Sequence, residues 1–423
     1  MKIIFHLTDH LPEYHQPWGG AEKVAYRHLS SLIDYQKGWK FYVGTVKPLK
    51  KIEEKFHHVR IWTIEDFFPK KLHLYVTGFK NQVFPFDPIA FFSVLVTAIR
   101  IKPDLIHIHK ANKISFAPII VGRLLKIPVV LAIYDYWYFC PGAMLIDAQS
   151  HPCHKFHGIW CRECSGIERF GPVAKFAAFF RKPLFDFFLN RVDRFLVLSE
   201  HNVQLLKEYG IDEKKIFVVR QPFNVQKFKE KVKVEKGKIF LNAWMAPHKG
   251  AHIVVAAMPY VLKKVPYAKL DIETKTLEPS YEKNLRKLIK KLGIENKVSI
   301  FDRITVETYL RNIVSSEVVV VAEQWENMAP TTLADAMSLG RPVVASDIGG
   351  LPEMVRDGKS GLLANAHNPQ DFAKKIVELM KNPSFASKLG KQAILDIKNF
   401  GSEKKIKKQM FDLYQSISTK LLS

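Results

Sequence analysis

Short apolar runs of strand length alternate with helical stretches along this chain, and the alternation occurs twice. In the first half, the runs that read as strands are residues 3–7, 41–46, 105–108, 129–133 and 195–198. Short apolar strands that are separated by helical stretches are typical of a parallel sheet with crossover helices. The pattern therefore predicts an α/β fold.

The alternation restarts after a break at Gln221-Pro222-Phe223-Asn224 and a lysine-rich linker. The predicted strands of the second half are residues 239–242, 268–273, 298–301, 318–322 and 342–346. We therefore expect two doubly wound, Rossmann-like domains, residues 1–222 and 223–400, with the carboxyl ends of both sheets facing a central cleft. The basic segment 401–423 is expected to form a C-terminal helix.

Net charge limits the partners that this chain can have. Lysine and arginine exceed the acidic residues by 23 charges, which favours phosphates, anionic lipid or nucleic acid. Because the basic residues are spread along the sequence, nucleic acid is the least favoured of these partners. The longest uncharged run has 13 residues and the first residues read as a strand, so we expect neither a membrane span nor a signal peptide, and a cytoplasmic location.

The densest chemistry lies between Glu323 and Leu363. Pro330 stands where a helix would begin, and Thr331 and Thr332 fill its first turn. The free N–H groups of such a helix start form a seat for phosphate oxygens. Glu326 before the helix and Asp335 inside it could accept hydrogen bonds from sugar or ribose hydroxyls. Taken singly, they could equally be a solvated loop residue and a residue that favours the helix dipole.

The whole stretch 323–363 resembles the signature of the retaining GT-B glycosyltransferases, the group that contains the glycogen and sucrose synthases. In that family two acids flank the donor, and Glu326 and Asp335 match them. Eight residues separate this pair, whereas the family has seven, so either Met328-Ala329 forms a bulge or Asn327 takes the first position. The resemblance implies that residues 327–331 bind the donor and that the last helix crosses back to the first domain.

A second donor element of the family is a strand followed by Lys-Gly, here Lys249-Gly250. The resemblance implies that the Lys249 ammonium neutralises the leaving diphosphate. Trp244 stands where the family has an arginine, and Lys275 or Arg303 could replace that cation. Residues 291–304 resemble the segment that holds the nucleobase.

The first half contributes a glycine pair and a histidine pair. Gly19-Gly20 follows the first strand and matches the family's glycine loop, where backbone without Cβ approaches the donor. His107 and His109 alternate with apolar residues and so share one face of a strand. We expect His109, at the strand end, to contact the acceptor and His107 to pack.

Directly after the strand at residues 129–133, the sequence differs from the family's pattern at one position. Tyr134 replaces the usual histidine near the donor sugar, while Asp135 and Trp137 are retained. Tyrosine is a poor proton acceptor near neutral pH, which argues against a histidine-type general base here. Asp135 as the base of an inverting reaction stays open, and we expect Trp137 on the acceptor side.

By resemblance, this is a nucleotide-sugar-dependent hexosyltransferase that retains anomeric configuration and needs no catalytic metal. The donor would be a UDP-, GDP- or ADP-sugar, and the acceptor a glycan or a lipid-linked saccharide. The catalytic candidates are Lys249, Glu326, Asp135 and Tyr134. Two alternatives stay open: an inverting or epimerase-type GT-B enzyme, and a zinc-containing nucleic-acid-binding protein.

All four cysteines lie within 25 residues, at Cys140, Cys153, Cys161 and Cys164. Their clustering and the Cys-x2-Cys pair favour a structural zinc site over two disulfides. His151, His154 or His157 could substitute for one thiolate. Such an ion would hold a loop and would not activate a nucleophile.

Residues 169–195 combine clustered aromatic residues with basic ones. Such a segment could rest on an anionic membrane surface, at the inner face of the membrane, and bring a lipid-linked acceptor to the enzyme. Packing in the core of the first domain is the equally favoured alternative.

Overall fold

The structure is a computed structural model that describes residues 2–11, 20–33, 38–49, 56–82, 85–147, 151–156, 161, 171–223, 228, 230, 232–274, 279–302 and 305–418. The chain divides into two compact units. The first contains residues 1–149, 153–222 and 403–423, and the second contains residues 150–152 and 223–402.

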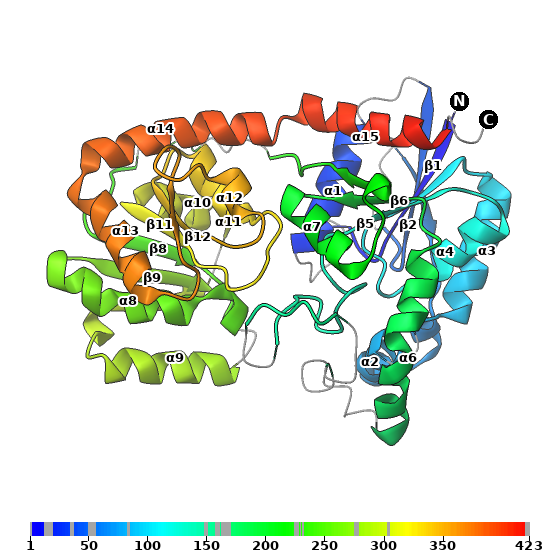
Figure 1. The fold of residues 1–423 in the computed structure, drawn as a ribbon, viewed down its shortest axis with the longest axis horizontal. Helices are drawn as coiled ribbons and strands as arrows, with labels where there is room; N and C mark the ends of the chain where they lie inside the picture. The colour runs from blue at the N-terminus through cyan, green and yellow to red at the C-terminus, as the bar shows by residue number, and fades with distance from the viewer. Residues whose placement is uncertain are drawn as a thin grey trace. The chain divides into compact units, whose positions relative to one another are not determined.

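The first unit is built on a parallel sheet (Figure 1). Among the described residues this sheet has seven strands in the order β3-β2-β1-β4-β5-β6-β7. The strands are β1 (Lys2–Thr8), β2 (Trp39–Thr45), β3 (His57–Arg60), β4 (Leu105–Ile108), β5 (Val129–Ala132), β6 (Arg194–Val197) and β7 (Ile216–Val218). The helices are α1 (Gly20–Ile33), α2 (His73–Gln82), α3 (Pro88–Ile101), α4 (Ala117–Leu124), α6 (Gly171–Leu189), α7 (Glu200–Tyr209) and α15 (Glu403–Ser418), with short 3-10 helices η1 (Ile64–Phe67), η2 (Lys70–Leu72) and η5 (Glu213–Lys215).

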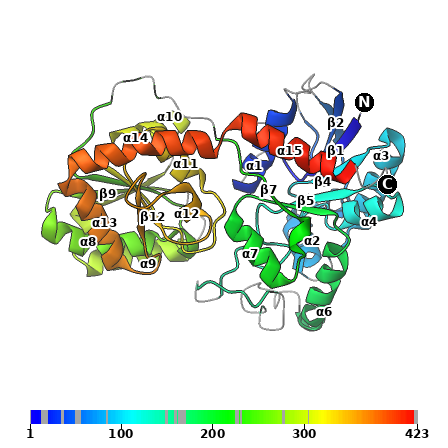
Figure 2. The ribbon, with the colours of Figure 1, turned by 45° about the horizontal axis from the view of Figure 1, so that its top comes forward.

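The C-terminal helix α15 packs in the first unit, beside α1 (Figure 2). The Tyr414 hydroxyl lies 2.6 Å from Nδ1 of His107 on β4. The ring of Phe411 lies 5.2 Å from that of Trp39 on β2. The last helix thus covers a sheet whose strands come from the beginning of the chain.

The second unit is built on a parallel sheet, which among the described residues has six strands in the order β10-β9-β8-β11-β12-β13. The strands are β8 (Lys238–Asn242), β9 (Lys269–Thr274), β10 (Val298–Asp302), β11 (Val318–Val321), β12 (Val343–Ser346) and β13 (Leu362–Ala364). The helices are α8 (Ala251–Lys264), α9 (Pro279–Lys291), α10 (Val306–Ser315), α11 (Thr331–Ser338), α12 (Leu351–Met354), α13 (Pro369–Lys381) and α14 (Pro383–Phe400), with η6 (Pro247–Lys249) and η7 (Glu295–Lys297).

Both faces of the second sheet are covered by helices. This explains why all four residues of β11 are valines. Val318 and Val320 belong to a core with α8, α9 and α13, whereas Val319 and Val321 belong to a core with α10, α11 and α12. Alternate side chains of a strand point to opposite faces, so a strand between two cores must be apolar throughout.

Each sheet reverses its strand order once, between β1 and β4 in the first unit and between β8 and β11 in the second. The crossover helices leave the two central strands on opposite faces, which opens a crevice at their carboxyl ends. Predicted site residues follow these strands, and Tyr134, Asp135 and Trp137 follow the neighbouring β5. The expected α/β class with two Rossmann-like domains is confirmed.

Candidate functional site

Gly250 fixes the position of Lys249 at the carboxyl end of β11. Its backbone is left-handed, with φ +68°, and a Cβ there would stand 1.8 Å from the Ala322 carbonyl oxygen. Only glycine allows this approach, because every other residue would bring a Cβ into the carbonyl. The Lys-Gly pair therefore joins the segment after β8 to the end of β11.

Because of this close approach, Lys249 lies beside Glu323. Lys249 Nζ lies 2.9 Å from Oε1 and 3.1 Å from Oε2 of Glu323, and the Trp325 indole N–H donates to Oε2 at 2.5 Å. The Glu323 side chain is buried, while Lys249 keeps 21% of its side chain exposed. The carboxylate therefore holds an ammonium that still faces solvent and can meet a second anion.

The loop after β11 is held by the Gly349-Gly350 turn. Gly350 N–H donates to the Asn327 carbonyl at 2.8 Å, and a Cβ on Gly349 would stand 2.7 Å from the same oxygen. Glu326 is buried at 6% exposure in this loop, and Met328 and Ala329 are buried beside it. Both Glu326 and Asn327 thus lie in one tightly packed turn, which leaves open which of them matches the family's first acid.

Helix α11 begins at this loop with an uncapped first turn. Pro330 occupies the N-cap position and offers no side-chain cap, so the N–H groups of Thr331 and Thr332 point toward the loop without that partner. Thr332 Oγ1 donates to Asn242 Oδ1 at 3.2 Å, at the end of β8. The helix start, β8 and β11 thus meet at one edge, with the amide groups and dipole that bind a phosphate.

Asp335 lies inside α11 and is buried at 8% exposure. The Tyr309 hydroxyl of α10 donates to its Oδ2 at 3.0 Å. This carboxylate is therefore oriented by a neighbouring helix, and its predicted ribose contact stays a prediction.

The pKa of His248, which precedes Lys249, lies well below its ordinary value. Burial, and then the Lys249 ammonium, lower the pKa of His248 to about 4. The imidazole is therefore neutral near pH 7, which leaves Lys249 as the cation of this segment.

The structure does not describe three of the residues predicted to bind the donor or to replace the family's arginine. Gly19, Arg303 and Lys275 lie outside the described residues. Gly20 is the first residue of α1, and Trp244 is exposed at 41%.

In the first unit, polar side chains gather at the carboxyl ends of β1, β4 and β5. Lys110 pairs with Asp135, which also accepts from Trp137 N–H at 3.0 Å. Asp9 is buried and accepts from Lys113 N–H at 3.1 Å. Burial raises the pKa of Asp9 to about 6. Asp9 and Lys110 were not predicted, although Asp9 directly follows β1 and Lys110 is the second residue after β4.

His109 and Tyr134 lie in the interior of the first unit. The Tyr134 hydroxyl contacts His28 Nδ1 at 2.7 Å and His109 Nδ1 at 3.0 Å, and His109 Nε2 contacts His6 at 2.9 Å. Each of these polar atoms already has a partner inside the fold. Their predicted contacts with acceptor and donor sugar remain predictions, and in this arrangement each would require exchange of a core hydrogen bond.

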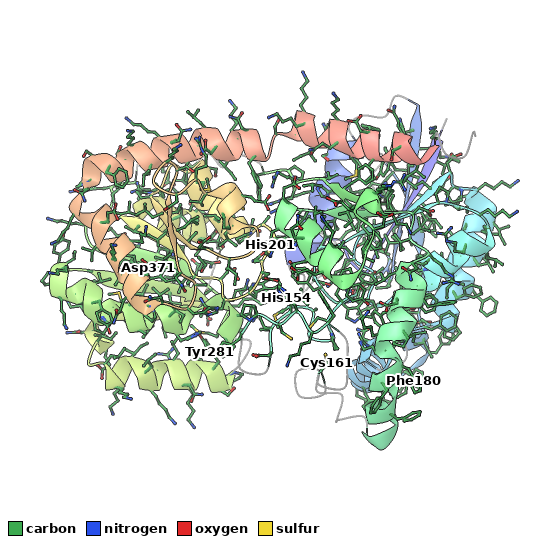
Figure 3. All side chains as sticks on the ribbon, viewed as in Figure 1. His154, Cys161, Phe180, His201, Tyr281 and Asp371 are labelled. Carbon is green, nitrogen blue, oxygen red and sulfur yellow. The ribbon has the colours of Figure 1, made fainter. Side chains whose placement is uncertain are left out.

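The cysteine cluster is described in part. Cys140 and Cys153 are free thiols, and Cys161 Sγ lies 3.2 Å from the Phe156 carbonyl oxygen (Figure 3). Cys164 lies outside the described residues, so the four-cysteine zinc site stays a prediction.

Two doubly wound units, with the Lys249 site at the switch point of the second, define a GT-B fold. Residues 18–227 match the family model described as Glycosyltransferase Family 4, and residues 222–396 match that of Glycosyl transferases group 1. The two models together span residues 18–396, and we place the chain among these glycosyltransferases.

Solved structures of the same fold cover nearly the whole chain. HepE of Anabaena, crystallised with UDP, is 17% identical with a TM-score of 0.69 and covers 98% of this chain and 100% of its own. Sucrose-phosphate synthase of Thermosynechococcus elongatus is 16% identical with a TM-score of 0.69, covering 99% and 100%. At these identities the likeness shows the fold.

Curated relatives match over shorter stretches. D-inositol 3-phosphate glycosyltransferase of Streptomyces bingchenggensis is 26% identical over 234 residues, 50% of each chain. Spore coat protein SA of Bacillus subtilis is 26% identical over 172 residues, 40% of this chain and 45% of its own. The chain thus spans about half the length of the curated relatives it matches.

Hydropathy adds one finding: among the described helices, none has both the length and the apolar character that crossing a bilayer requires.

Proposed function

We propose that this protein transfers a hexose from a UDP-sugar to a glycan or lipid-linked saccharide, with retention of anomeric configuration. The observation that carries the proposal is the Lys249–Glu323 pair beside the open first turn of α11. The fold likeness to HepE, whose structures contain UDP and UDP-glucose, favours uridine as the base.

In this proposal the diphosphate lies on the start of α11 with Lys249 against it. Uncapped N–H groups and an ammonium that is held in place stabilise the negative charge that grows as the diphosphate leaves. Glu323 keeps the ammonium from moving, so the site is preorganised before the donor arrives.

Transfer breaks the bond between the anomeric carbon and the diphosphate oxygen and forms one from the acceptor oxygen to the same carbon. In a retaining reaction of this family the acceptor proton passes to a phosphate oxygen of the leaving diphosphate. The arrangement of Asp135 supports this route, because its carboxylate is ion-paired with Lys110 and accepts from the Trp137 N–H. Both carboxylate oxygens therefore already have partners, Oδ2 the Lys110 ammonium and Oδ1 the Trp137 N–H.

The experiment that tests this reaction is NMR of the first product formed from a UDP-hexose and an acceptor panel. The anomeric coupling of the new linkage should match the donor's configuration. An inverted linkage would contradict retention, and nucleotide release without a second sugar would point to an epimerase-type reaction. Lys249→Ala is the control, since it should abolish transfer and leave the fold intact.

A lipid-linked acceptor is supported by the surface of α6. Phe176, Phe179, Phe180 and Phe187 are 50–66% exposed there (Figure 3 labels Phe180), whereas Phe185 is fully buried against Phe116. The helix therefore packs into the core with one face and presents phenylalanines on another.

Helix α2, which contacts α6, and the turn before it extend this apolar surface. The exposed residues are Phe67, Phe68, Leu72, Tyr75 and Phe79, next to the exposed Lys70 and Lys71. Just after α6, the guanidinium of Arg191 stacks over the Phe187 ring, with its carbon 3.5 Å from the ring centroid. Aromatic side chains beside basic ones fit the boundary of an anionic bilayer, where rings insert and cations meet lipid phosphates.

Liposome flotation tests this surface, with Phe179→Ser/Phe180→Ser as the variant. Each ring is worth roughly 1.5–3 kcal/mol on full burial, so binding to anionic vesicles should fall at least tenfold. Leu395→Ser, which removes a 55% exposed apolar residue from α14 of the second unit, is the matched control and should bind normally. Equal binding of all three proteins, or none by the unchanged protein, would contradict the membrane surface.

A further inference from the structure

Three buried histidines lie together in the first unit, apart from the Lys249 site. His6 on β1 is the register partner of His107 on β4, and His109 follows two residues later on the same face. Their exposures are 0%, 0% and 2%. The rings of His107 and His109 stack at 4.0 Å, and that of His6 lies 5.3 and 5.2 Å from them.

A chain of hydrogen bonds determines where the protons of this cluster sit. His28 Nε2 lies 3.0 Å from the Arg220 carbonyl oxygen and must donate to it, because a carbonyl cannot donate. His28 Nδ1 of the neutral ring therefore accepts from the Tyr134 hydroxyl. Tyr134 oxygen in turn accepts from His109 Nδ1–H, so His109 Nε2 carries a lone pair.

The chain ends at His6. His6 Nδ1–H donates to His109 Nε2 at 2.9 Å, which leaves His6 Nε2 as a bare lone pair. That atom is buried and has no hydrogen-bond partner among the residues that the structure describes.

His107 also has a buried nitrogen that makes no hydrogen bond with the described residues. Its Nδ1 is bonded to the Tyr414 hydroxyl at 2.6 Å, while its Nε2 is buried without a partner. A buried polar atom left unpaired costs about 1–3 kcal/mol, so two in one cluster call for a ligand that supplies them with bonds.

One nitrogen of each of the three rings can be chosen so that all three lie within 4.8 Å of one another. Metal–imidazole bonds are about 2.0–2.1 Å long, so a small inward movement brings the nitrogens to one ion. Binding exchanges the His6–His109 hydrogen bond for metal–nitrogen bonds. The Tyr414 and Tyr134 hydroxyls on the other nitrogens of His107 and His109 then act as the outer partners that orient ligating histidines.

We propose that His6, His107 and His109 form a buried site for a borderline transition metal ion such as Zn²⁺, which ties β1 and β4 to α15 through Tyr414. Imidazole ligands select Zn²⁺, Co²⁺, Ni²⁺ or copper over Mg²⁺ and Ca²⁺, which require oxygen. This site shares no residue with the cysteine cluster or with the proposed donor site at Lys249.

The test uses the full-length protein with Cys153→Ser/Cys161→Ser, which weakens any thiolate site and leaves the histidines intact. After refolding with Co²⁺, this variant should hold one ion per chain, with visible d–d bands and no thiolate-to-cobalt charge-transfer band. X-ray absorption of the Zn²⁺ form should show nitrogen scatterers in place of sulfur.

His6→Asn and His107→Asn complete the design. When added to the Cys153→Ser/Cys161→Ser protein, each change should abolish binding of the ion. Each should also abolish the rise in melting temperature that Zn²⁺ gives the Cys153→Ser/Cys161→Ser protein. No ion in the cysteine variant, a spectrum with sulfur ligation, or an unchanged ion content in a folded histidine variant would overturn the proposal. If a histidine variant fails to fold, the cobalt and X-ray absorption spectra of the Cys153→Ser/Cys161→Ser protein still test the proposal.

Discussion

Lys249 Nζ and the Glu323 carboxylate form a two-bond ion pair, with N···O distances of 2.9 and 3.1 Å. Glu323 is buried and its other partner is the Trp325 indole N–H. The pair joins residues that are 74 positions apart. It holds the Lys249 ammonium, which is the cation of the proposed donor site.

The two members of this pair should differ in what their removal costs. Lys249→Ala leaves a buried carboxylate without its cation, which should cost about 1–3 kcal/mol of unfolding free energy, whereas Glu323→Gln leaves Lys249 able to turn to water and should cost less. In the double variant the losses should not add, because the second change removes the charge that the first stranded. Urea unfolding of the four proteins measures this coupling. Additive losses would mean that the ion pair is not formed in solution.

Gly250→Ala should harm both stability and nucleotide binding. A methyl group there would stand 1.8 Å from the Ala322 carbonyl oxygen, so the segment must move and take Lys249 with it. Gly293 is the matched control, because it has a similar φ of +64° but no atom within 4 Å of an added Cβ. Gly293→Ala should cost only the left-handed strain, about 1–2 kcal/mol, and leave UDP binding unchanged. Thermal melts and calorimetry compare the two, and equal effects would rule out the packing argument.

The low pKa of His248 should make the fold sensitive to acid. Its pKa in the folded protein is about 4 against 6.5 for the ordinary value, so the unfolded chain takes up the proton first as pH falls. The stability that the neutral ring contributes is present above pH 6.5 and is lost as pH falls through 4, by about 3 kcal/mol. His248→Asn should therefore show a flatter decline between pH 6.5 and 4 than the unchanged protein. Parallel curves from urea unfolding at several pH values would show that the ring is not protected from protonation.

The strands that sequence reasoning found are those with continuous apolar runs. Residues 318–322 and 342–346 are placed at or within one residue of β11 and β12, because a strand between two cores has no polar position. Strands β3, β7 and β13 were missed. Each lies at an edge of its sheet among the described strands and has at least one partly exposed position, so it lacks the full burial of the central strands.

The candidate site was predictable where the chemistry is local. Lys249-Gly250 and the start of α11 at Pro330 could be read from adjacent residues. Glu323 could not, because its contact with Lys249 depends on strand order in the folded sheet.

The face on which a strand residue lies was predictable, but what covers that face was not. His107 and His109 do share a face, yet the hydroxyl that caps His107 belongs to Tyr414, more than 300 positions later in the chain. For residues 169–195 the sequence favoured a membrane surface and core packing equally, and α6 has side chains of both kinds: Phe185 is fully buried, whereas Phe180 is 55% exposed.

Calorimetric titration of UDP, GDP and ADP into the unchanged protein and into Lys249→Ala tests the central claim most directly. We expect UDP to bind the unchanged protein more tightly than GDP or ADP, and Lys249→Ala to bind it at least tenfold more weakly while its melting curve stays cooperative. Equal affinity of the two proteins for UDP, or no affinity of the unchanged protein for any of the three nucleotides, would contradict a nucleotide-sugar site at Lys249 and α11.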